Sequence, residues 1–499
     1  NSPVAEWYKI LQSLPWEQYR SIAADYYNAL YHFNKSKTNS QISGDLSEEQ
    51  KETATQRLLF ERATMDETAS VLSEEKFITD ILPTVSPSMI APGKTPDRLG
   101  GKKPKCFFAL FKSFIGASLM GLEAIPEKVH LLLTSNLSFA RVSGFIPKAD
   151  NDQYWFNYVP SIRKLEQFDQ IMTDYGLWDR LKIKEVIENL EQGIIKEEKE
   201  LVGDTTHFHA YSGFETVTYI DEKGKEQRKS QSKTTKNCRC KDKGNCEHPW
   251  ELADDGAGTI VKALNKYIWG HKASILGLPM QGIPLDAIAV ADAATHDGET
   301  FFPHVVRLFA QYPEIKSWID TVLYDSACDS QPLKDKFQDQ LGIALKASLN
   351  PRRKKTVTEN LPKGMKKLTA YGNLVCNADF EMDYQGARYK TEKFIYQAPL
   401  DENGTSVCDN CEQKSMCCPV ALNGRIVQVS FDMLAHIDSQ DPPMAKRFKA
   451  IMTRRPSVER MIKRLKCDLG DDRLKKRNNA SFQAYLDKTM IAFHILLRN

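Results

Sequence analysis

Apolar side chains repeat at helical spacing in the first part of the chain and at strand spacing further on. Pro15 interrupts the first helical segment, and a polar stretch from 35 to 56 separates it from the next. We therefore predict a mainly helical N-terminal region. Its helical segments are expected at 4–33, 104–122, 125–145 and 161–192.

From about residue 198 the apolar runs are short and β-rich, and they alternate with two helical segments. Three strands, a helix, a strand, a helix and a strand predict a mixed α/β sheet. A last amphipathic helix is predicted over 456–470, because Pro456 suits a first turn and Gly470 an end. The expected segments of the sheet region are 199–213, 265–279, 284–297, 298–313, 317–330, 331–342 and 343–351.

Length and composition indicate a globular chain with several domains. Its 499 residues exceed one ordinary domain, and the hydrophobic share of 41% excludes disorder of the whole chain. We find no uncharged apolar run of about 18 residues, so no membrane span is expected. The segment from Asn1 to Arg20 lacks a basic region followed by an apolar core. We therefore expect an intracellular protein with reduced cysteines.

The formal net charge of +3 conceals three strongly basic segments. Residues 223–243 carry a net charge of +7, residues 351–368 carry +6, and residues 446–477 carry +9. The rest of the chain is therefore acidic. Basic stripes in an acidic protein are typical of proteins that bind a phosphate backbone. Charged loops without a partner are the alternative.

Seven of the eleven cysteines lie in two tight clusters. The first cluster reads Cys238-x-Cys240-x5-Cys246-x-His248. Four soft or borderline ligands within such a short segment suit a tetrahedral Zn²⁺ ion. We expect this zinc to be structural, because no ligand position is left open for chemistry.

The second cluster reads Cys408-x2-Cys411-x5-Cys417-Cys418 and also predicts a zinc site. Two adjacent cysteines ligate one ion only with strained geometry, so one member of the pair is expected to be a spectator. Buried reduced thiols or an iron–sulfur cluster are the alternatives for both clusters.

Three acidic residues occupy positions that suit a divalent-cation site. Asp204 ends the strand in KELVGD, Asp325 ends the strand in VLYD, and Glu459 lies on the last predicted helix. Phosphoryl transfer on a nucleic acid uses divalent cations held by carboxylates on rigid elements. The rival acids are Asp221, Asp254 and Asp292 for the first position and Asp297, a plausible helix cap, for the second.

These elements and acids resemble the DDE transposases of bacterial insertion sequences, whose core is RNase H-like. In that family the acids lie on the first strand, near the end of the fourth strand and on the last helix. Asp204, Asp325 and Glu459 match those positions, and the segment VLYDSACDS resembles the motif around the second acid. The segment Gly270–Lys272, GHK, also resembles a strand motif of these enzymes.

One subgroup of the family carries a Tyr-x2-Arg-x3-Glu-x6-Lys signature. Arg455, Glu459 and Lys466 match three of its positions, and Met452 replaces the tyrosine. The resemblance implies that the three acids bind Mg²⁺ or Mn²⁺ and that the Arg and Lys contact DNA phosphates. Further DNA-binding candidates from the basic segments are Arg352, Arg353, Arg454 and Lys463.

The long stretch of chain between Asp325 and Glu459 exceeds what one helix and one strand require, and it resembles the β-rich insertion domain of the same family. The predicted organisation therefore has four parts. They are a helical DNA-binding and dimerisation region over 1–197, an RNase H-like core over 198–350 with a zinc-binding insert at 223–250, an insertion domain over 351–445, and the final core helix with a helical C-terminal region over 446–499.

The resemblance implies a DNA transposase of the bacterial cytoplasm, associated with the nucleoid. Such an enzyme binds the terminal inverted repeats of its element as a homodimer or larger assembly, cuts the DNA and joins it to target DNA. The residues alone indicate only a metal-dependent nucleic-acid enzyme. The alternatives are a zinc-containing DNA-binding regulator with a retained core, and an RNase H-like nuclease without strand transfer.

Overall fold

The computed structural model describes residues 3–42, 105–145, 158–236, 238, 240–263, 266–350, 356–420 and 424–499. Two predicted DNA contacts, Arg352 and Arg353, lie outside these residues. Within the described ranges, no helix combines the length and the apolar character that crossing a bilayer requires.

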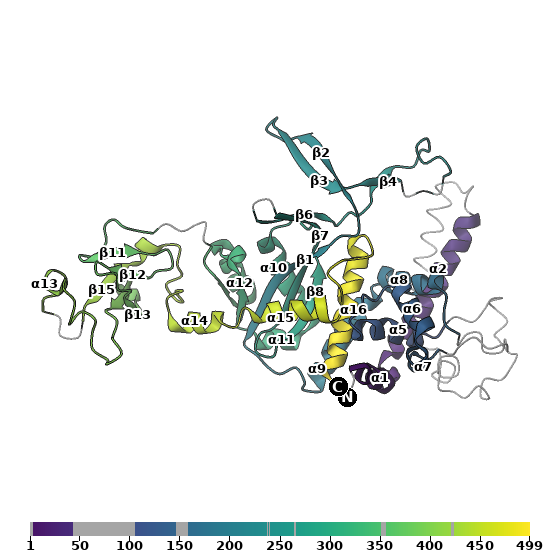
Figure 1. Cartoon of the computed structure of the whole chain (residues 1–499), viewed down its shortest axis with the longest axis horizontal. Helices are drawn as coiled ribbons and strands as arrows, with labels where there is room; N and C mark the ends of the chain where they lie inside the picture. The colour runs from purple at the N-terminus through teal and green to yellow at the C-terminus, as the bar shows by residue number, and fades with distance from the viewer. Residues whose placement is uncertain are drawn as a thin grey trace.

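The helices before the sheet share one apolar core, which confirms the predicted helical N-terminal region (Figure 1). Helix α5 is apolar on nearly all sides and lies in the middle, where Phe107, Phe111 and Phe114 pack near Phe168 and Trp178. The elements are α1 (Pro3–Ser13), η1 (Trp16–Tyr19), α2 (Arg20–Ile42), α5 (Phe107–Leu119), α6 (Pro126–Ser135), α7 (Leu137–Ser143), α8 (Ile162–Asp174) and α9 (Leu177–Glu191).

A mixed sheet follows, as predicted, and it contains one strand, β6, beyond the five that were expected. Its order is β10-β9-β1-β7-β6, with β8 also paired to β7. Strand β1 runs parallel to β9, and β9 runs parallel to β10. Strand β7 is antiparallel to β1, β6 and β8. The strands are β1 (Glu200–His209), β6 (Gly258–Ala263), β7 (Lys266–Leu278), β8 (Ile283–Ala289), β9 (Thr321–Tyr324) and β10 (Ala344–Ala347).

Asp204 lies inside β1 and not at its end, which differs from the sequence-based expectation. The strand continues because the next residues still pair with β7, from Thr205 opposite Ser274 to His209 opposite Gly270. Phe208 in this extension is fully buried against α16. Pairing with β7 and the burial of Phe208 therefore extend β1 beyond Asp204 to His209.

Helices cover both faces of the sheet. On one face Phe301 packs against Tyr324 and Phe337. On the other face, Val458 and Met461 of α15 pack against Val202 and Leu323. The helices are α10 (Asp297–Gln311), α11 (Pro313–Trp318), η5 (Ser326–Cys328), α12 (Gln331–Leu341), α15 (Ser457–Lys463), its π-helical extension η9 (Arg464–Asp468), and α16 (Asn479–Leu497).

Helix α16 joins the helical region to the sheet. It contacts α5 and α9 on one side and β8 on the other, and Figure 1 shows it standing between the two parts. Its residues from 482 to 495 are almost all buried, so the two parts share one continuous core.

Two inserts leave the sheet. The first lies between β1 and β6 and projects from one end of the sheet (Figure 1). It contains the hairpin of β2 (Phe214–Ile220) and β3 (Glu226–Ser232), followed by the pair β4 (Thr234–Lys236) and β5 (Trp250–Leu252).

The second insert follows β10 and lies on the side of the sheet away from the helical region (Figure 1). It has its own apolar cluster around Leu368, Phe394 and Tyr396. Its elements are β11 (Met365–Leu368), β12 (Leu374–Cys376), β13 (Asp383–Arg388), η7 (Tyr389–Thr391), β14 (Lys393–Gln397), α13 (Lys414–Cys417), β15 (Ile426–Ser430), η8 (Phe431–Leu434) and α14 (Lys446–Met452).

Candidate active site and metal centre

Arg455 connects two of the three predicted acids. Its Nη2 lies 2.8 Å from Oδ2 of Asp204, and its Nη1 lies 2.9 Å from Oε1 of Glu459. Both Asp204 and Arg455 are largely buried, whereas the Glu459 side chain is 63% exposed. The packing of α15 on the sheet therefore brings the strand acid and the helix acid to one guanidinium group.

Asp325 follows β9 directly and caps the short helix η5, where its Oδ1 accepts a hydrogen bond from the Ala327 N–H at 2.8 Å. Strand β9 is the parallel neighbour of β1, so this acid, at the end of β9, lies near Asp204 in the middle of β1. The prediction that Asp325 ends a buried strand is confirmed.

A fourth acid, Asp297, joins the group from the first turn of α10. It accepts a hydrogen bond from Thr205 Oγ1 at 3.0 Å and pairs with Lys272 at 3.0 Å. The sequence offered Asp297 as a rival of Asp325 and as a helix cap, but His296 is the capping residue. Asp297 lies beside the middle of β1 together with Asp204, so it joins the group as a further acid.

Asp204 shows the electrostatic coupling of the group. Burial raises its pKa to about 6, Arg455 opposes the rise, and the nearby charges of Asp325 and Asp297 add to it. Several carboxylates that raise each other's pKa form an environment in which a cation binds favourably. Their oxygens are hard ligands that suit Mg²⁺ or Mn²⁺.

The rival acids serve the fold elsewhere. Asp221 accepts hydrogen bonds from the N–H groups of Lys223 and Lys225 and closes the β2–β3 hairpin. Asp254 is buried beside His271 at 3.1 Å. Asp292 is exposed and accepts a hydrogen bond from a backbone N–H two residues ahead.

The predicted phosphate-binding residues of η9, of α15 and of the turn before α15 have different surroundings. Lys466 donates a hydrogen bond to the His207 carbonyl and lies 5.0 Å from the Phe208 ring centre, and burial lowers its pKa. Arg454 pairs with Glu200 at 2.5 Å. Lys463 is exposed.

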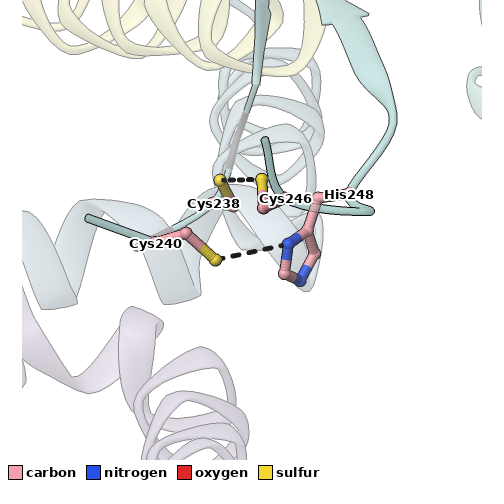
Figure 2. Close-up of side chains that lie close together, drawn as sticks. All are labelled: Cys238, Cys240, Cys246 and His248. Atoms are coloured by element: carbon pink, nitrogen blue, oxygen red, sulfur yellow. Dashed lines mark hydrogen bonds between the residues drawn. The ribbon is translucent and has the colours of Figure 1, made fainter. Parts of the chain in front are cut away.

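The first cysteine cluster forms a compact group of ligands, as predicted. The ligand atoms of Cys238, Cys240, Cys246 and His248 all lie within 4.8 Å of one another. Figure 2 shows the sulfurs of Cys238 and Cys246 facing each other at 3.5 Å, and the sulfur of Cys240 facing His248 Nδ1 at 3.5 Å. Tetrahedral zinc requires ligand separations of roughly 3.5 Å, so this group could bind zinc.

The candidate zinc site closes the loop between β4 and β5. Lys236, at the end of β4, lies 3.5 Å from the sulfur of Cys246 and 5.4 Å from the ring centre of Trp250. Hydrogen bonding, first of all with His248, lowers the pKa of Cys246 to about 6, which favours the thiolate that a metal requires.

The second cysteine cluster lines a cavity of the second insert. Among the residues that the structure describes, only the first cluster groups three or more such side chains closely enough to hold an ion. A fifth cysteine, Cys376, lines the same cavity. In the sequence, Cys376 lies outside both cysteine clusters.

Comparisons with known proteins give a distant structural match. No family model and no curated protein matches the chain. Among solved structures, a piggyBac transposase synaptic complex with hairpin DNA aligns with a TM-score of 0.31 and 9% sequence identity. The alignment covers 78% of this chain and 64% of that chain, so this protein is similar to slightly less than two thirds of the transposase subunit.

Proposed function

We propose that the protein is a DNA transposase with an RNase H-like core and a catalytic triad of Asp204, Asp325 and Glu459. The observation that carries the proposal is the group of acids near Arg455, where elements far apart in sequence bring carboxylates together at the middle of β1 and the end of β9. Buried carboxylates are rarely grouped without a cationic partner, so the group favours a metal-dependent reaction.

The order of the strands supports the proposal. The core places β1 in the middle, two parallel strands on one side and an antiparallel strand on the other. An RNase H-like core has this arrangement, with acids on the first strand, after the fourth strand and on the last helix. Asp204, Asp325 and Glu459 occupy these positions.

The acids would hold one or two divalent cations between them. Bound cations supply a more acidic water nucleophile and stabilise charge on the phosphate oxygens. In the metal-free site Arg455 neutralises Asp204 and Glu459. With cations bound to the acids, the Arg455 guanidinium would be available to bind the scissile phosphate, for which its planar donors are well suited.

Basic segments near the sheet would bind the DNA backbone. The β2–β3 hairpin carries exposed basic residues, Lys223 and Lys225 in its turn and Arg228 and Lys229 on β3. Phe214, Tyr219 and Ile220 of β2 are also exposed. The candidate zinc loop continues this surface beyond β4. Lysine and arginine contacts of this kind give affinity that does not depend on sequence. The terminal inverted repeats of the element would be recognised by the helical region.

The proposal is tested by Mg²⁺-dependent nicking of DNA that carries the end of the element. Asp204→Asn and Asp325→Asn should abolish nicking, while Asp221→Asn and Asp292→Asn, matched changes outside the group, should remain active. Loss of activity in all four variants, or in none, would contradict the assignment.

A joining assay separates the transposase from its alternatives. A transposase converts the nicked end into a product joined to target DNA, whereas a nuclease without strand transfer stops at the nick. A DNA-binding regulator would bind the same DNA and produce neither product. Cross-linking on element-end DNA would test the proposed dimer or larger assembly.

A further inference from the structure

The side chains of Asp204 and Thr205 lie on opposite faces of the sheet, because successive residues of a strand alternate. Asp204 shares a face with Val202, which packs against α15. Directly paired residues of neighbouring strands lie on the same face, and Thr205 is paired with Ser274. The Ser274 hydroxyl lies 2.8 Å from Nδ1 of His304 in α10. The face that carries Thr205 is therefore the one that α10 covers.

Asp297 contacts β1 from this second face. Its Oδ2 accepts a hydrogen bond from the Thr205 hydroxyl at 3.0 Å, and its Oδ1 pairs with Lys272 at 3.0 Å. Lys272 also donates a hydrogen bond to the Thr295 carbonyl at 2.5 Å. Each carboxylate oxygen of Asp297 thus has a partner on the face opposite to the Asp204 side chain. This arrangement holds β1 in place and does not turn Asp297 toward the face of Asp204.

Lys272 and Asp297 form an ion pair that is largely shielded from solvent. The side chain of Lys272 is 7% exposed and that of Asp297 is 18% exposed. Lys272 belongs to β7, which pairs with β1, and Asp297 lies in the first turn of α10. Solvent screens such a pair less than it screens a surface pair. The pair therefore fixes the start of α10 against the middle of the sheet.

Thr205 connects this pair to the catalytic face. Its hydroxyl donates to Asp297, and its backbone N–H donates to Oδ1 of Asp204 at 2.8 Å. The other oxygen of Asp204, Oδ2, contacts Arg455. The direction of the Asp204 carboxylate therefore depends on where Thr205 is held. Groups that bind a reacting centre must be fixed to within about 0.5 Å of the productive geometry.

We propose that Asp297 and Lys272 are positioning residues, which hold Thr205 and thereby direct the Asp204 carboxylate toward a bound cation. Asp297 is then a support behind the strand and not a ligand of that cation. The proposal rests on the proposed function, since the direction of Asp204 affects the rate only if this acid takes part in catalysis.

The rate of nicking of element-end DNA at saturating Mg²⁺, measured with the full-length protein, tests the proposal. Thr205→Val removes the hydroxyl and keeps the β-branched shape, so it should slow nicking roughly tenfold without changing gel-shift affinity. Thr205→Ser restores the hydroxyl and should recover most of the rate. Asp292→Asn, at an exposed acid before α10, is the control. A merely structural role would lower the urea midpoint of Thr205→Val and leave the rate of the folded protein unchanged.

Asp297→Asn should also slow nicking, and its combination with Thr205→Val should be no slower than the slower single variant, because both changes act on one contact. If Asp297→Asn does not fold, the two Thr205 variants decide the question. A parent-like rate in Thr205→Val would overturn the positioning role and leave the transposase proposal intact. Complete loss of nicking in Asp297→Asn, as expected for Asp204→Asn, would overturn it by making Asp297 a ligand. A parent protein that does not nick DNA would overturn the proposed function itself.

Discussion

Arg455 contacts a buried acid with one nitrogen and an exposed acid with another. The buried contact matters more for electrostatics, because solvent screens the exposed one. Asp204 therefore depends on Arg455 for its ionisation, whereas the Glu459 side chain is mostly exposed to solvent. The two acids should respond differently to substitution of the residue between them.

Arg455→Ala should raise the pKa of Asp204 above its value of about 6. A neighbouring cation favours the ionised carboxylate, so its removal favours the protonated form. The ¹³C carboxyl resonance of Asp204 in the metal-free protein, assigned with Asp204→Asn, measures this shift. Arg455→Lys keeps the charge and serves as the control. An unchanged pKa in Arg455→Ala would contradict the ion pair.

Glu459→Gln should leave DNA binding intact and reduce nicking by roughly three orders of magnitude or more. The side chain is exposed on the first turn of α15, so the amide is accommodated without repacking. Removal of a negative charge from a basic surface should, if anything, strengthen binding. Gel-shift affinity and the nicking rate in Mg²⁺ are measured together. Near-normal nicking would show that α15 only binds DNA.

Among the elements, the β4–β5 pair illustrates how a short sheet is maintained. Each strand has only three residues, and the loop between them contains the four ligands of the candidate zinc site. Such a pair has little stability of its own in water. A zinc ion would therefore hold the basic loop in one conformation and lower the entropy cost of DNA binding.

Cys246→Ser should remove one zinc per chain and weaken DNA binding by about tenfold, or ~1.4 kcal/mol. The unfolding temperature of the main core should change little, because the loop lies outside the principal apolar cluster. Zinc analysis, gel shift and thermal unfolding measure the three effects. Cys467→Ser, at an exposed cysteine, is the control. Equal DNA affinity without zinc would assign the site a different role.

Local sequence patterns predicted most strands and helices of the sheet region and the grouping of the first cysteine cluster, because both depend on residues that are close together in the sequence. The contact of Arg455 with Asp204 could not be predicted. It depends on the rotation of α15 about its axis, which Val458 and Met461 set by packing on the sheet. The position of Cys376 beside the second cluster could not be predicted for a similar reason, since only the folded insert brings Cys376 to the cavity that Cys408 lines.

At the scale of the whole molecule, a buried ion network joins the helical region to the sheet. Lys182 of α9 is fully buried and lies 2.5 Å from Asp286 of β8 and 3.1 Å from Asp487 of α16. Asp286 also contacts Arg307 at 3.1 Å. No sequence pattern signals such a lysine, because an isolated charge within an amphipathic helix is normally solvated.

Lys182→Ala should destabilise the protein by about 3–5 kcal/mol. The change leaves buried carboxylates without their main cation, which costs more than the pair itself contributes. Lys199→Ala, which breaks an exposed pair with Glu197, should leave the stability nearly unchanged. Urea unfolding compares the two variants. Similar midpoints would mean that water or a rearranged side chain compensates for Lys182.

The salt dependence of DNA binding should identify the basic surface. Each phosphate contact contributes about 0.9 to the slope of log affinity against log salt concentration. Replacing Lys223, Lys225, Arg228 and Lys229 of the β2–β3 hairpin by Ala should therefore lower the slope by up to about 3.6. Lys196→Ala with Lys199→Ala, near the start of β1, is the control and should leave the slope unchanged.

The place of α16 in the core has a consequence for synthesis on the ribosome. Helix α9 ends at Glu191 and its partner α16 begins at Asn479, so the whole sheet and both inserts are translated between them. At the usual rate of elongation this takes roughly 15 to 60 s. Meanwhile the faces of α5 and α9 that α16 later covers are exposed to water. The nascent helical region is therefore a substrate for chaperones, and a chain that stalls before Asn479 would present an apolar surface that aggregates.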